Sequence, residues 1–120
     1  MKMHYILHNG KTVAEVVSES AVINTVQDAL DCMADAYANG AERILVYHTN
    51  LNPEFFKLKT GFAGAVLQKF SNYNMKLAVT GDVTRFPSRS LASFITESNR
   101  GSSLFFMPDR ESALEALTRQ

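Results

Sequence analysis

The feature that most constrains the fold is the alternation of short, apolar, β-rich runs with longer segments of helical periodicity. Arg43 to Tyr47 and Lys76 to Val79 lack polar alternation, which is typical of strands covered on both faces. Ser103 to Met107 reads as a last strand of the same series. Strands that alternate with helices imply right-handed crossovers and a parallel sheet.

Two further β-rich runs open the chain, His4 to His8 and Thr12 to Val17. Between them lies Asn9-Gly10, a dipeptide favoured where a hairpin turn requires positive φ. This hairpin adds an antiparallel strand. The sequence therefore predicts an α/β fold of order β-β-α-β-α-β-α-β-α, with a mixed, mainly parallel sheet of five strands.

The segments between the predicted strands have the periodicity of helices. Ser20 to Asn39 is expected to form the first helix, closed by Asn39-Gly40. Its predicted apolar face comprises Val22, Val26, Leu30, Met33 and Tyr37. The second helix, with Thr60 as its cap, is expected to bury Phe62, Val66, Phe70 and Tyr73.

Start signals mark the remaining helical segments. Asn52-Pro53-Glu54 predicts a short helical turn, since Asn is a good cap and Pro suits the first helical position. Pro87 and Ser88 precede a third helix, and Asp109 is expected to cap a fourth. Leu91, Phe94, Ile95 and Ser98 are in register on one face of the third helix, and the fourth helix runs through Leu114 and Leu117.

Length and composition favour one domain over residues 1–120. Twelve basic residues balance twelve acidic ones, which argues against nucleic acid as a partner, because phosphate backbones select uncompensated cations. We expect no membrane segment, no signal peptide and a cytoplasmic location. Cys32 is the only cysteine, so no disulfide forms within the chain, and its place in an apolar pattern predicts a core residue.

Charge is nonetheless uneven along the chain. Seven acids stand against one base between Glu15 and Glu54, and seven bases against two acids between Lys57 and Arg100. If the fold keeps these segments on separate faces, the surface could steer a charged partner or a second copy. A homodimer is therefore one hypothesis, and two ordinary solvated faces are the alternative.

Ligands of open α/β sheets bind beyond the carboxyl ends of the strands. The loops expected there are His48 to Thr60, Thr80 to Arg89 and Met107 to Asp109. Free amides where Thr60-Gly61 opens a helix could hold an anion. The predicted site comprises Lys57, Lys59, Thr60, Gly61, Phe62, Asp82, Arg85 and Arg89. The alternative is that these residues form an ordinary capped helix with solvated lysines, since such a helix would have the same sequence pattern.

Aromatic residues and histidines add two further hypotheses. Phe55, Phe56, Phe62 and Phe86 could wall an apolar pocket or a partner surface, with at least two of them in the core. His48 and Asp82 lie near strand ends and could serve a small enzyme. The spacing of the histidines and the single cysteine gives no metal site, and we expect no cofactor.

Several stretches carry a resemblance to a known family. Leu51 to Gly64, Leu67 to Tyr73, Gln27 to Leu30 and Phe94 to Asn99 resemble family 4180 of bacterial domains of unknown function. The resemblance covers nearly the whole chain and implies no known activity.

The order of elements is also similar to that of STAS domains of anti-sigma-factor antagonists. Their second helix opens with Asp-Ser-Ser/Thr-Gly-Leu-Gly, and the matching run here is Leu58 to Gly64. Thr60 and Gly61 agree with that pattern, but Lys59 replaces the Ser that accepts phosphate there. The resemblance implies a regulatory domain without enzymatic activity, which binds a protein or a small anionic ligand, with Thr60 as a substitute acceptor.

Overall fold

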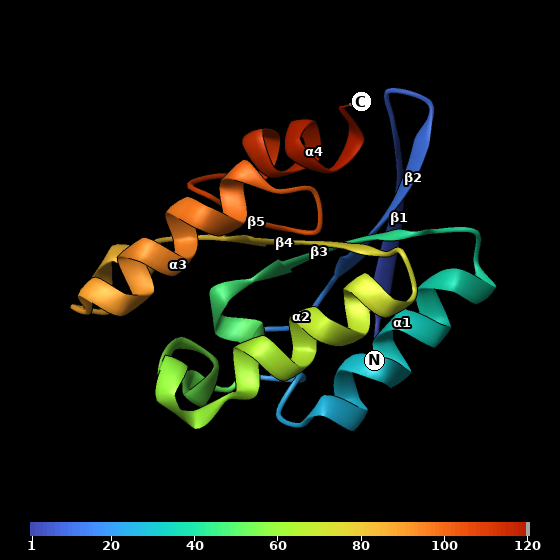
Figure 1. Cartoon of the computed structure of the whole chain (residues 1–120). Coiled ribbons are helices and arrows are strands. Elements are labelled where there is room, and N and C mark those ends of the chain that lie inside the picture. Colours follow the sequence, from blue (N-terminus) through green and yellow to red (C-terminus); the bar gives the residue numbers. More distant parts are fainter. Residues whose placement is uncertain (120) are drawn as a thin grey trace.

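The strands follow one another across the sheet in chain order. The computed structural model describes residues 1–119, shown in Figure 1. The sheet has the order β1-β2-β3-β4-β5, with β1 antiparallel to β2 and all other pairs parallel. The bounds are Met3–His8, Lys11–Val16, Arg43–Tyr47, Lys76–Thr80 and Leu104–Met107. The predicted mixed, mainly parallel sheet is therefore confirmed.

Four helices connect and follow the strands: α1 (Val26–Ala38), α2 (Phe62–Asn72), α3 (Arg89–Arg100) and α4 (Arg110–Thr118). Two predicted caps are confirmed, because the side chains of Asn52 and Asp109 each accept a hydrogen bond from a first-turn amide, and Ser88 caps α3 in the same way. The prediction that Thr60 caps α2 was wrong, since the N-cap of that helix is Gly61 in a left-handed conformation. The Asn9-Gly10 hairpin is also confirmed, with φ of 51° and 76°.

The order of the strands decides which helices cover which face. Three right-handed crossovers between consecutive neighbours place α1, α2 and α3 on one face. The chain then passes the edge strand β5, and α4 packs on the opposite face against Leu45, Ala78 and Phe105. Figure 1 shows α1 and α2 on one side of the sheet and α4 on the other.

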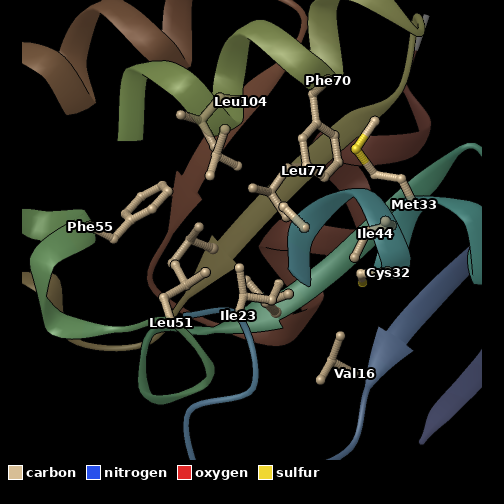
Figure 2. Packing of buried hydrophobic residues seen from close by; sticks show 14 of the residues in the cluster. Val16, Ile23, Cys32, Met33, Ile44, Leu51, Phe55, Phe70, Leu77 and Leu104 are labelled. Carbon is tan, nitrogen blue, oxygen red and sulfur yellow. The ribbon is translucent and has the colours of Figure 1, made fainter. Parts of the chain in front are cut away.

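The larger core lies between the sheet and α1–α3. Ile44 and Leu77 come from neighbouring strands and share this layer with Phe70 of α2, as Figure 2 shows. Met33 and Cys32 reach it from α1, and Cys32 is buried as predicted. Burial raises the pKa of the Cys32 thiol to about 12, which makes it an inert core group.

Two sequence predictions about the helices were wrong. α1 begins at Val26 because Thr25 and Asp28 form a reciprocal capping box, so the preceding residues stay outside the helix. Its buried face carries Ala29, Cys32, Met33 and Ala36. Tyr37 at the end of α1 is 66% exposed and Tyr73 after α2 is 63% exposed, although both were expected to be buried.

Phe70 and Tyr73 provide a matched test of this packing. Phe70→Ala should lower the free energy of unfolding by about 3–5 kcal/mol, because it empties a site that is 1% exposed. Tyr73→Ala should cost less than about 0.5 kcal/mol, since the side chain points to solvent. Urea unfolding followed by circular dichroism measures both values. Equal losses would contradict the assignment of the buried face.

Candidate functional site

The loops that leave β3 and β4 meet at the carboxyl end of the sheet. They enclose a groove of about 640 Å³. One wall is Phe56 to Lys59, from the segment between β3 and α2, and the other is formed by Phe86, Pro87, Ser88 and Ser90, before and within α3. This volume lies within the usual range for small-molecule sites.

Aromatic side chains form the base of this groove. The rings of Phe56 and Phe86 stack with centroids 4.5 Å apart and an interplanar angle of 8°. Phe55 packs edge-on against Phe56 at 5.3 Å and against Phe62 at 5.9 Å. Phe55 and Phe56 are buried, whereas Phe62 and Phe86 are half-buried. At least two of the four therefore belong to the core, as the sequence predicted.

The two lysines of the groove differ in their charge environment. Lys57 Nζ lies 3.2 Å from the Glu54 carboxylate, so its charge is partly compensated. Over residues 1–119, Lys59 has no carboxylate within 4.0 Å, and its side chain belongs to the lining. Lys59 is therefore the better cation for an anionic ligand.

The Gly61 amide, which the sequence suggested as the donor to an anion, is already hydrogen-bonded within the turn before α2. The Gly61 amide donates to the Leu58 carbonyl at 3.0 Å, and the Phe62 amide donates to Thr60 Oγ1 at 3.3 Å. Thr60 Oγ1 itself donates to the Glu54 carbonyl at 3.0 Å. The helix start that faces the groove is instead that of α3, through Ser88 and Ser90.

Asp82, Arg85 and Arg89 come from the second predicted segment but do not line the groove. The Asp82 carboxylate accepts hydrogen bonds from the hydroxyl and the amide of Thr84, which hold its pKa below the ordinary value. The Arg85 guanidinium lies 5.8 Å from the centroid of the Phe86 ring. Arg89 is the exposed first residue of α3.

His48 lies where the ends of β3 and β4 meet. Its imidazole packs so closely on Gly81 that a Cβ at that position would overlap His48 Cδ2. Its ring centroid is 6.3 Å from that of Phe86. Burial and the neighbouring Arg85 charge lower the pKa of His48, against an opposing effect of Asp82. No hydrogen bond joins His48 to Asp82 in the part of the chain that the structure describes.

A second hollow, of about 410 Å³, lies between the ends of β4 and β5. Its lining comes from Gly81 to Thr84, from Ile95 of α3 and from Phe106 to Pro108. The connections that leave β4 and β5 go to opposite faces, so this is the topological switch point of the sheet. The sequence analysis placed Thr80 to Arg89 and Met107 to Asp109 at this end of the sheet, but it did not predict the switch point, which depends on the face that α4 covers.

On the α4 face, a buried carboxylate completes this end of the sheet. Glu15 accepts two hydrogen bonds from Arg110, at 2.9 and 3.2 Å, and one from the Tyr47 hydroxyl at 2.7 Å. Burial opposes ionisation of Glu15, but these bonds outweigh it and lower its pKa. The ion pair joins β2 to the start of α4.

Residues 1–119 contain neither a candidate metal site nor a candidate membrane span. No group of three or more His, Cys, Asp or Glu side chains is placed to hold a metal ion. No helix in this part of the chain is both long enough and apolar enough to cross a bilayer.

The fold and the groove define an α/β domain with a mixed sheet, three helices on one face and one on the other. A family model described as a domain of unknown function (DUF4180) matches residues 8–117, and the chain belongs to that family. No curated protein and no solved structure matches the chain.

Two glycines test the close packing at His48. Gly81→Ala should destabilise the protein by about 1–3 kcal/mol or more, because its φ of +115° disfavours a side chain and the new Cβ meets His48. Gly64→Ala, inside α2 with open space around it, should instead stabilise by about 0.5–1 kcal/mol. Urea unfolding distinguishes the two, and a neutral Gly81→Ala would contradict the packing.

The charges around His48 provide a test by titration. Arg85→Gln should raise the pKa of His48 and Asp82→Asn should lower it, as followed by NMR of the imidazole protons. Arg100→Gln, on an arginine that pairs with Glu97, should leave the pKa of His48 unchanged.

Because folding favours neutral His48, the stability of the protein should fall as the pH drops below 6.5, the ordinary pKa of histidine, and His48→Gln should remove that loss. An unchanged pKa in Arg85→Gln would contradict the arrangement.

Proposed function

We propose that this chain is a non-enzymatic, cytosolic binding domain with a regulatory role. Its groove takes an anionic ligand with an apolar body, either free or as part of a protein partner. The observation that carries the proposal is the groove between Phe56–Lys59 and Phe86–Ser90, where an aromatic base meets an uncompensated lysine.

The two kinds of lining suit the two parts of such a ligand. Leu58, Pro87 and the stacked Phe56 and Phe86 provide an apolar surface that excludes water from a ring or an acyl chain. Lys59 offers a charge at the edge, and the hydroxyl of Ser90 can donate a hydrogen bond. Apolar contacts would supply affinity, and the polar groups would orient the ligand.

The regulatory part of the proposal is supported by the order of elements, which is similar to that of STAS domains. Phosphorylation at Thr60 has weaker support. Its exposed hydroxyl bonds to the backbone on both sides and stabilises the turn before α2. A ligand-operated domain agrees better with these contacts than a domain switched by a kinase.

An enzyme that uses His48 and Asp82 is the alternative. The His48 ring packs on Gly81, the residue before Asp82, so the two residues are neighbours. However, Asp82 Oδ1 accepts both of its hydrogen bonds from Thr84, and none joins Asp82 to His48 within residues 1–119. His48 therefore lacks the directly bonded acid that would orient it as a general base.

Binding of anilinonaphthalene sulfonate, an aromatic anion, tests the proposed groove. The wild-type protein should bind the dye saturably, as measured by fluorescence. Lys59→Glu should raise the dissociation constant about fivefold or more, because it exchanges an attractive charge for a repulsive one. Phe86→Ala should also weaken binding, since it removes half of the aromatic stack.

Two controls separate the groove from general adhesion of the dye. Lys69→Glu changes the same charge on α2, away from the lining, and should leave the affinity unchanged. The uncharged phenylnaphthylamine should bind wild type and Lys59→Glu equally. Equal sulfonate affinity in wild type and Lys59→Glu would overturn the proposal.

A further inference from the structure

The opposite end of the sheet carries one cation on each of three adjacent parallel strands. Lys11 begins β2, Arg43 begins β3 and Lys76 begins β4. Side chains alternate between the two faces along a strand. Each of these residues lies two positions before a residue that packs on α4, namely Val13, Leu45 or Ala78. The three side chains therefore share the α4 face. Arg119, directly after α4, lies over the ring of Phe105 on β5, with 5.8 Å from Cζ to the centroid.

Two of these cations have a clear structural role. Lys11 Nζ donates to the Thr118 carbonyl at 2.9 Å, and Arg43 Nε donates to the Leu117 carbonyl at 2.8 Å. Both bonds satisfy carbonyls at the end of α4, where the helix dipole is negative. This role does not extend to Lys76 or Arg119.

Within the described residues, no acidic side chain pairs with this cluster of Lys11, Arg43, Lys76 and Arg119. No carboxylate of residues 1–119 lies within 4.0 Å of Lys11, Arg43, Lys76 or Arg119. The end of a helix offsets only about half an elementary charge. Burial, and then the charges of Arg43, Lys11 and Arg119, lower the pKa of Lys76. Arg43 and Lys76 are partners in register on β3 and β4, and Lys11 and Arg119 lie at the end of α4, so four cations gather at one edge of the sheet without an acidic side chain of residues 1–119 paired to them.

We propose that Lys76 and Arg119, together with Arg43, form a binding site for a phosphate group. A doubly charged oxyanion would compensate the surplus charge, and the planar guanidinium groups can each give it two parallel hydrogen bonds. Lys76, between Arg43 on the neighbouring strand and Arg119 above β5, supplies the central charge.

This site is independent of the groove at the carboxyl end. β4 runs from Lys76 to Thr80, so the two ends of the strand are separated by roughly 13 Å. The groove residues and the phosphate-site residues come from different segments. A variant at one end can therefore be used without changing the other.

NMR titration of the full chain with inorganic phosphate and with pyrophosphate, at constant ionic strength, tests the proposal. Saturable chemical-shift changes are expected for the backbone amides of Lys76 and Ser103. Ser103 lies beside Lys76, because its carbonyl accepts a hydrogen bond from the Leu77 amide. Phosphate should also raise the pKa of the Lys76 ammonium. Acetate, with one charge, should bind about tenfold more weakly. Shifts that follow ionic strength alone would overturn the proposal.

Variants assign the binding to these side chains. Lys76→Gln and Arg119→Gln should each raise the phosphate dissociation constant about fivefold or more. The backbone amide of Arg119 donates to the Glu115 carbonyl of α4, a bond that its substitution keeps. Lys69→Gln, on the opposite face, should leave it unchanged. Arg119 is exposed, so its variant keeps the test valid if Lys76→Gln fails to fold. Unchanged affinity in Arg119→Gln, or wild-type binding weaker than about 10 mM, would refute the site.

Discussion

Burial of the sheet on both faces is the constraint that decides where this domain can do chemistry. In β3, Ile44, Leu45 and Val46 are all fully buried, although they alternate between the layer under α1–α3 and the layer under α4. An ionised side chain in the middle of such a strand would lose its hydration without gaining a partner. Polar groups are therefore confined to the ends of the strands, and both candidate sites lie there.

At the carboxyl end, Asn50 is a buried polar side chain that is fully hydrogen-bonded, whereas the buried hydroxyl of Thr80 at the end of β4 has no partner within residues 1–119. Asn50 is 0% exposed, accepts from the Tyr47 amide at 2.9 Å and donates to the carbonyls of Ser18 and Ser20 at 3.0 and 3.2 Å. The backbone carbonyl of Asn50 also accepts from the amides of Val22 and Ile23. This one residue thus joins the chain after β2 to the chain after β3 and anchors the segment that leads to the groove.

Local patterns predicted the order of elements because strand runs, caps and turn residues act over a few positions. They failed where a distant contact decides. The residues after Ser20 have helical periodicity, but hydrogen bonds to Asn50 hold part of them in a loop. The rule for parallel strands correctly predicted that the two groove segments meet. It could not show that the Gly61 amide is already bonded, nor that Ser90 faces the groove, since both depend on the path of the loops.

α4 connects the two ends of the sheet and explains why their charges differ. At about 1.5 Å per residue its nine residues span some 13 Å, close to the length of β3 or β4. Its first residue, Arg110, pairs with Glu15 at the carboxyl end, and its last carbonyls accept from Lys11 and Arg43 at the amino end. These contacts account for two of the four cations at the amino end. Lys76 is partly buried beside Arg43, its partner in register on β3, and neither of the two side-chain bonds to the end of α4 comes from it. The Lys76 charge has no structural role among these contacts, and a bound phosphate group would explain its place in the cluster.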